Sequence, residues 1–181
     1  MSILVALRIA RSSSRSSGVS TPASTAVASD CSSGLAPELD IEIWGYGTHA
    51  LAAGSPIRKR YPGEAWGLDM YEILAHSQVT LNPQIEAAEG FANSMRLFEA
   101  TGVGTMLVTD DGKNLSELFR RAEEVVSYAN EDDAVRALRR FVENKDERLR
   151  IAEAGQARTL NEHTYARRIP ELVELLESRL K

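Results

Sequence analysis

Short apolar runs that are typical of strands alternate with stretches of helical periodicity from about residue 39 onward. DIEIWGYG predicts a buried strand from Ile41 to Trp44 that ends at glycines. QVTLN, TMLVT and EEVVSY are later runs of the same kind. Strands that alternate with helices form parallel sheets covered on both faces. The sequence therefore predicts an α/β, Rossmann-like parallel sheet with flanking helices.

Two of the predicted helices lie between these strands. In LDMYEILAHS, apolar residues at spacings of three and four predict one buried face. SMRLFEAT is the second helix, and the glycines of Gly102 to Gly104 end it before the next strand. In this second helix we expect Leu97, Phe98 and Thr101 to face the sheet. The face expected in the first helix consists of Leu68, Met70, Tyr71 and Leu74.

Helices also predominate in the C-terminal part of the chain. Asn114 is expected to cap a short helix, LSELFRR. After the last strand come a helix with an apolar stripe, a second helix, DERLRIAEAGQARTL, and a helical C-terminal tail with one apolar face. The stripe of the first consists of Ala134, Val135, Leu138, Phe141 and Val142, and that of the tail of Tyr165, Ile169, Leu172, Val173, Leu176 and Leu180.

Composition argues against several classes of function. The 181 residues carry a net charge of −5, which gives no electrostatic reason to expect a nucleic-acid or anionic-membrane partner. A single cysteine, Cys31, forms no internal disulfide and fits a reducing, cytoplasmic location. The histidines, His49, His76 and His163, are too scattered to suggest a metal site. No apolar run approaches the roughly 20 residues of a membrane span.

Residues 1–32 differ in composition from the rest of the chain. They are rich in serine and alanine and contain no acidic residue before Asp30. Three interpretations are open: a disordered tail with too few large apolar groups to fold, an organellar transit segment, or a non-native leader before a shortened domain. A secretory signal is disfavoured because Arg8 interrupts the apolar stretch ILVAL too soon. The domain itself is expected to occupy residues 33–181.

The turn between QVTLN and SMRLFEAT is the best candidate for a ligand site. In doubly wound sheets, ligands collect beyond the carboxyl ends of the strands. The first N–H groups of the helix that starts near Asn93 suit a phosphate or diphosphate, and Gly90 allows close approach of the backbone. Glu99 has two interpretations. It is either a surface carboxylate paired with Arg96 or an acceptor of hydrogen bonds from a sugar diol.

The run NSMRLFEATGVGTMLVTD, with TLN before it and EEVVSY and EAGQARTLNEHTYARR after it, resembles the glycosyltransferase group 1 domain. The branch it resembles most is that of the spore-maturation, CgeB-like enzymes, and the match extends from about Asp40 to the C-terminus. This resemblance implies the C-terminal, donor-binding half of a GT-B glycosyltransferase. It also implies that the helix cradles the donor diphosphate and that Glu99 holds the ribose. The donor-binding residues expected on this basis are Glu89, Asn93, Ser94, Met95, Arg96 and Glu99.

The sequence departs from the family's pattern at one important position. Retaining members of the wider superfamily often carry two glutamates separated by seven residues, and the partner of Glu99 at this spacing is Phe91. Either Glu89 takes over this role or the second glutamate is absent, so retention of the anomeric configuration is open. The basic trio at residues 58–60 has two interpretations as well. Arg58 and Lys59 either contact the diphosphate or belong to a solvated loop.

Three further motifs have simpler structural explanations. His163 is expected to pack or cap at a helix start. Asp110 and Asp111, in DDGKN, are expected to form a turn rather than a metal pair. Gly45-Tyr46-Gly47 is a fragment of a glycine-rich fingerprint, which in the resembled fold faces the cleft between the two halves.

The function expected first is transfer of a sugar, of hexosyl type, from a nucleoside diphosphate to an acceptor. Helix N–H groups and basic side chains would stabilise the departing diphosphate, so no cofactor or metal is expected. No general base is assigned, because in GT-B enzymes it commonly comes from an N-terminal acceptor half, which would be a partner here. A non-catalytic nucleotide-sugar-binding or assembly module is the alternative. A nucleotide-sugar epimerase is a third possibility, but it would need more carboxylates and histidines in the cleft.

Overall fold

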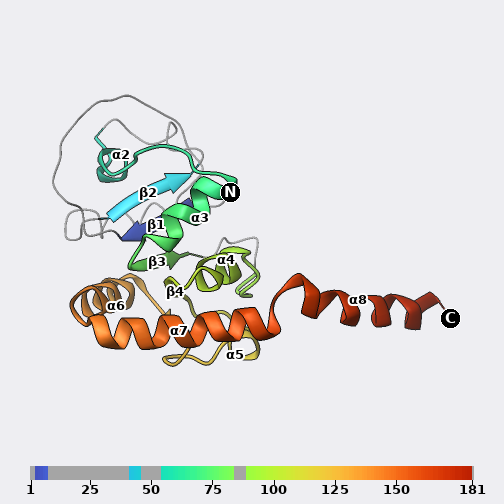
Figure 1. Ribbon diagram of the computed structural model, residues 1–181. Helices are drawn as coiled ribbons and strands as arrows, with labels where there is room; N and C mark the ends of the chain where they lie inside the picture. Colours follow the sequence, from blue (N-terminus) through green and yellow to red (C-terminus); the bar gives the residue numbers. More distant parts are fainter. Residues whose placement is uncertain (1–2, 8–40, 46–53, 84–88, 181) are drawn as a thin grey trace.

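The computed structural model describes residues 3–7, 41–45, 54–83 and 89–180, which form one mixed sheet with helices on both faces (Figure 1). The described strands are ordered β2-β1-β3-β4-β5 in the sheet. Their bounds are β1 Ile3–Leu7, β2 Ile41–Gly45, β3 Val79–Asn82, β4 Met106–Asp110 and β5 Val126–Tyr128.

The parallel sheet predicted from the sequence is confirmed for three strands. β3 pairs with β4 and β4 with β5, both in parallel. β1, by contrast, is antiparallel to both of its neighbours, β2 and β3. β2 therefore runs in the same direction as β3, with one reversed strand between them.

Strand β1 lies within the segment that was expected to precede the domain, and it is paired on both sides. Val5 has Ile43 of β2 as its partner on one side and Leu81 of β3 on the other. ILVAL therefore belongs to the sheet, because its backbone pairs with a neighbouring strand on each of its two sides. Residues 8–32 of the leader lie outside the described residues.

The predicted helices are present, each within a few residues of the expected position. α2 is a short helix in the segment expected to be a basic loop, and Ile57 packs it onto Ile41 and Ile43 of β2. The short helix expected at LSELFRR stops earlier than predicted, at Leu118. The bounds are α2 Pro56–Lys59, α3 Gly67–Ala75, α4 Arg96–Gly102, α5 Leu115–Leu118, α6 Glu131–Glu143, α7 Lys145–Glu162 and α8 Tyr165–Leu180.

Two apolar clusters cover the two faces of the sheet. Along β4, Met106 and Val108 belong to one cluster, and Leu107 between them belongs to the other. Because successive residues of a strand point to opposite faces, β4 is buried on both sides. The first cluster includes residues of α6 and the first half of α7, and the second includes residues of α3, α4 and α5.

Helix α3 buries Met70 and Leu74 of the predicted face, but Ile73 takes the place of Leu68 and Tyr71. Met70, Ile73 and Leu74 are buried, whereas Leu68 is 84% and Tyr71 38% exposed. The hydroxyl of Thr105, just before β4, donates to the carbonyl oxygen of Leu74 and so attaches the end of α3 to the sheet. The exposed side of α3, with Tyr71, borders the candidate site described below.

The last two helices, α7 and α8, differ in how they pack. α7 packs first beside α6 and then against α4, where Thr101 Oγ1 and Thr159 Oγ1 lie 2.6 Å apart. α8 projects away from the body (Figure 1), and its residues are exposed throughout. The apolar face predicted for the tail, including Ile169, Leu172 and Leu176, is therefore not buried within the described residues. No helix in these ranges is long and apolar enough to span a membrane.

Candidate functional site

Polar side chains connect the carboxyl ends of β3 and β4 with the start of α4. Asn82 donates through Nδ2 to Thr109 Oγ1 (3.1 Å), and Thr109 Oγ1 donates to the carbonyl oxygen of Asn82 (3.1 Å). Ser94 Oγ donates to Asn82 Oδ1 and accepts from the N–H of Arg96, at 3.2 Å in both cases. The position of the first turn of α4 is thus determined by the ends of two parallel strands.

The segment before α4 is held from the other side by the β4–α5 turn. Asn114 accepts from the N–H of Ala92 (2.7 Å) and donates to its carbonyl oxygen (3.2 Å). Asn114 stands at the start of α5, but its side chain does not cap that helix as predicted. Gly90 adopts φ +79°, and its carbonyl oxygen accepts from the N–H of Lys113 at 2.9 Å. Asn114 and Lys113 therefore fix the entry to α4.

The N–H groups at the start of α4 are largely occupied within the chain. That of Arg96 bonds to Ser94 Oγ, that of Leu97 to the Ser94 carbonyl oxygen, and those of Phe98 and Glu99 to the Met95 carbonyl oxygen. These four N–H groups of the first turn of α4 therefore already have acceptors within the chain. The expected backbone contacts of Ser94 and Met95 with a diphosphate stay predictions.

Arg96 and Glu99 form an ion pair on α4 that is mostly withdrawn from solvent. Arg96 Nη1 lies 2.9 Å from Glu99 Oε2, and the two side chains are 8% and 16% exposed. Arg96 Nη1 also contacts the sulfur of Met70 on α3. Burial lowers the pKa of Arg96, and the charge of Glu99 opposes this effect. The predicted pairing is present, but it is a buried pair rather than a surface pair.

Glu99 borders a pocket of about 470 Å³ between α3, α4 and the α7–α8 junction. Its volume lies in the range of small-molecule sites. Asn93 and Met95 line the same pocket, so the structure brings three of the predicted donor-binding residues together. Tyr71, Phe98 and Arg168 also line it, from α3, α4 and α8, and His163 lines it from the end of α7.

The other predicted donor-binding residues do not line this pocket. Ser94 is half-buried in the Asn82 cluster, and Arg96 lies behind Glu99. Glu89 is exposed with φ +49°, and its carbonyl oxygen accepts from Lys113 Nζ. Arg58 and Lys59 belong to α2, beside the edge strand β2 (Figure 1). Whether they contact a diphosphate stays a prediction.

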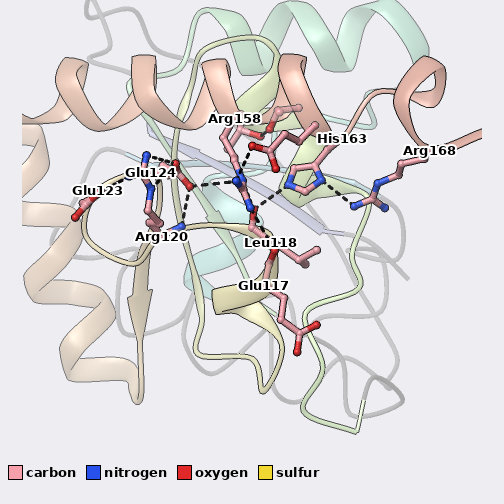
Figure 2. A network of polar contacts seen from close by, with 11 residues as sticks. Glu117, Leu118, Arg120, Glu123, Glu124, Arg158, His163 and Arg168 are labelled. Atoms are coloured by element: carbon pink, nitrogen blue, oxygen red, sulfur yellow. Dashed lines mark hydrogen bonds and ion pairs between the residues drawn. The ribbon is translucent and has the colours of Figure 1, made fainter. Parts of the chain in front are cut away.

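His163 terminates α7 and packs against two aromatic rings. Its ring centroid lies 5.0 Å from that of Phe98 and 5.3 Å from that of Phe119. Figure 2 shows its two polar contacts, Nε2 with the carbonyl oxygen of Leu118 (2.8 Å) and Nδ1 with Arg168 Nη2 (3.0 Å). The packing role expected for His163 is confirmed, although it stands at the end of α7 rather than the start of α8.

A polar network continues from His163 towards β5 (Figure 2). Arg158 Nε donates to the same Leu118 carbonyl oxygen (3.0 Å), and Arg158 Nη1 pairs with Glu162 (2.7 Å). Buried Glu124 accepts from Arg120, with Arg120 Nη2 at 2.7 Å from Glu124 Oε1. The network fixes α7, and with it the wall of the pocket, to the segment between α5 and β5.

Sequence reasoning missed Tyr71, Phe98 and Arg168 as pocket residues. Tyr71 and Phe98 had been placed on core faces by their apolar character, and Arg168 lies 69 positions after Glu99 in the sequence (168 − 99). No local pattern shows that the start of α8 returns to α4.

Two further predictions concern the remaining motifs. Asp110 and Asp111 form a turn as expected, in which the N–H of Gly112 bonds to the carbonyl oxygen of Asp110 (3.0 Å). Asp111 pairs with Arg121 at 2.7 Å. Of Gly45-Tyr46-Gly47, only Gly45 is among the described residues, and it ends β2.

Comparison with solved structures finds the same fold in glycosyltransferases. Alr3699/HepE from Anabaena, solved with UDP-glucose, superimposes with a TM-score of 0.56 at 16% identity, covering 66% of this chain and 32% of that chain. Sucrose-phosphate synthase from Thermosynechococcus elongatus gives 0.57 at 11% identity, covering 68% and 31%. A glycosyltransferase from Rickettsia africae gives 0.53 at 12% identity, covering 69% and 33%.

These similarities show the fold of the chain and how much of each similar structure it covers. The parallel strands with their flanking helices match the Rossmann-like C-terminal domain of GT-B glycosyltransferases, and the chain spans about one third of the length of these structures. No protein of curated function matches the chain. The glycosyl transferase-like family matches residues 30–174, which is most of the chain. The chain belongs to the glycosyl transferase-like family.

Proposed function

We propose that this chain is the donor-binding half of a GT-B glycosyltransferase that takes a nucleoside diphosphate sugar as its donor. The observation that carries the proposal is the position of Glu99, whose carboxylate borders the pocket while Arg96 fixes it from behind. A carboxylate has two oxygens, so the pair with Arg96 leaves it able to accept from a ribose diol. The UDP-glucose complex of Alr3699/HepE, which shares the fold, supports a donor of this class.

The finer assignment rests on the sequence motifs. We place the chain in the CgeB-like branch, as a hexosyltransferase-like enzyme, because of NSMRLFEATGVGTMLVTD and the motifs that follow it. The cytoplasm is proposed as its location because the single cysteine fits a reducing compartment. Protein groups rather than a metal are proposed to stabilise the departing diphosphate. The general base and the acceptor site are assigned to an N-terminal half.

Helix α8 gives a reason to expect a partner. Its apolar side chains Ile169, Leu172 and Leu176 are each more than half exposed. Exposed apolar surface of this extent commonly marks a protein interface. The alternative function, a non-catalytic nucleotide-sugar-binding module, shares the pocket and differs only in lacking turnover.

Calorimetric titration with UDP, GDP, ADP and dTDP and their common sugars tests the proposal. We expect one nucleotide to bind, and Glu99→Gln to weaken its binding by about 1–3 kcal/mol, since the variant loses the charged acceptor and keeps its shape. Glu153→Gln, at an exposed position of α7, is the control and should bind like the wild type. Absence of binding by every nucleotide would refute the proposal.

A second experiment separates the enzyme from the binding module. We expect the isolated chain to transfer sugar barely or not at all, and addition of an N-terminal acceptor half, in trans or fused, to raise transfer by orders of magnitude. Binding without turnover in both settings would favour the non-catalytic module. Epimerisation of the free nucleotide sugar would identify the third possibility.

A further inference from the structure

The pocket beside Glu99 contains one guanidinium among the described residues that line it, that of Arg168. Arg96, the cation expected from the sequence, is 7% exposed and directs Nη1 at Glu99. The backbone N–H groups of residues 96–99 are also engaged within the chain. Arg168 is therefore the cationic side chain that an anionic ligand would meet among the described residues lining this pocket.

Arg168 is oriented by two neighbours. Its guanidinium carbon lies 4.6 Å from the ring centroid of Phe98, and Nη2 lies 3.0 Å from His163 Nδ1. Stacking of a guanidinium on an aromatic face leaves its in-plane N–H groups directed outward. One of the five N–H groups is used by His163, so others remain for a planar, two-point contact with phosphate oxygens.

The contacts of His163 also define its protonation state. Arginine only donates, so Nδ1 must accept from Arg168, and the proton is therefore on Nε2, which donates to the Leu118 carbonyl oxygen. Burial lowers the pKa of His163, and the charges of Arg168 and Arg158 lower it further. The bond to Leu118 and the charge of Glu162 oppose these effects. The imidazole is neutral at neutral pH.

We propose that Arg168 binds the phosphate groups of the ligand in this pocket, with His163 and Phe98 as positioning residues. The inference rests on the proposed function and adds a cation on α8 to the site. Glu99 and Arg168 then form a matched pair of opposite charges along one pocket. A nucleoside diphosphate offers a diol to the carboxylate and an anion to the guanidinium.

The first test compares Arg168→Gln with Arg167→Gln, a neighbouring arginine that does not line this pocket. Calorimetry is done with UDP, GDP, ADP and dTDP and with the matching nucleosides. Arg168→Gln should weaken diphosphate binding about tenfold to a hundredfold and leave nucleoside binding unchanged, because a charge-assisted contact is lost. Arg167→Gln should match the wild type. Arg168→Lys keeps the charge without the two-point contact, and an intermediate affinity is expected.

The outcomes separate this inference from the proposed function. Diphosphate binding by the wild type that persists in Arg168→Gln overturns the role of Arg168 and leaves the donor site at Glu99 intact. Equal losses for diphosphate and nucleoside also overturn it, since they indicate a packing role. A wild type that binds no nucleotide overturns both.

The second test addresses His163. His163→Phe keeps the ring between Phe98 and Phe119 and removes the acceptor for Arg168. Diphosphate affinity should fall severalfold at pH 7.5, with nucleoside affinity unchanged. As the pH is lowered, the wild type should converge on the variant, because protonated Nδ1 no longer accepts from Arg168. The ligand's own protonation affects both proteins equally. If the wild type and His163→Phe bind the diphosphate with the same affinity at every pH, His163 does not position Arg168.

Discussion

Arg96 Nη1 lies 2.9 Å from Glu99 Oε2 across one turn of α4, and the two side chains are 8% and 16% exposed. Removing one member of a buried ion pair costs more free energy than removing both, because the remaining charge is left in a medium of low polarity. Because Glu99 also lines the pocket, a change in this pair affects both the stability of the fold and the candidate site.

We predict that Arg96→Met lowers the free energy of unfolding by about 3 kcal/mol. This is the lower end of the range for broken buried ion pairs, because the carboxylate of Glu99 lines the pocket and is not fully buried. The double variant Arg96→Met/Glu99→Gln should recover much of this loss. Urea denaturation measures both, with Arg150→Met on the exposed side of α7 as the control. The single variant Glu99→Gln completes the cycle: if the loss in the double variant equals the sum of the two single losses, the pair has no coupling energy.

Gly155 is predicted to resist substitution by alanine although it lies within a helix. A Cβ there would overlap the carbonyl oxygen of Glu124 and lie 3.4 Å from Thr101 Cγ2. Backbone cannot move as a side chain does, so the clash should outweigh the helix-forming advantage of alanine, with a net loss of about 1–3 kcal/mol. Thermal unfolding of Gly155→Ala is compared with Gly54→Ala, where a Cβ meets nothing within 4 Å. A rise in melting temperature would contradict the close approach of α7.

The stability of the folded chain should fall as the pH drops below about 6.5, the ordinary pKa of histidine. Burial lowers the pKa of His163 in the folded state, so between this pKa and 6.5 the unfolded chain binds more protons. Stability is lost across that window as the pH falls and is regained as it rises. His163→Phe should lack this component when urea midpoints are measured from pH 7.5 to 5. His76→Gln, at an exposed histidine, should retain it.

Composition alone predicts that deletion of residues 1–32 leaves the melting temperature nearly unchanged. The pairing of strand β1 predicts instead that changes in this strand lower the stability of the fold. Val5 is paired on both sides, so Val5→Pro removes a donor from the interior of the sheet. We expect a loss of about 1–3 kcal/mol in the free energy of unfolding. Val5→Thr keeps the backbone N–H and the branched shape and is the control. Equal stability of the proline variant and the wild type would place ILVAL outside the folded domain.

The order and type of most elements follow from the sequence alone, because each depends on local periodicity. The strand at Ile41 to Trp44 and the helices around residues 131–143 and 145–162 have patterns whose period identifies them before any packing is known. The motif around Glu99 likewise identified the family, since it is continuous along the chain. Its pairing with Arg96 was predictable from the spacing of three residues.

Burial, strand direction and the set of residues that line the pocket depend on how the elements pack in three dimensions. The periodicity of α3 admits more than one apolar face, and the packing against β4 selected Ile73 over Leu68. ILVAL lacks local turn signals that would join it to a sheet, and its pairing with β2 and β3 depends on residues far along the chain. Arg168 reaches Phe98 because α7 returns along α4, which a contact between Thr101 and Thr159 secures. Contacts between distant residues follow from the packing of whole elements, and local patterns do not encode them.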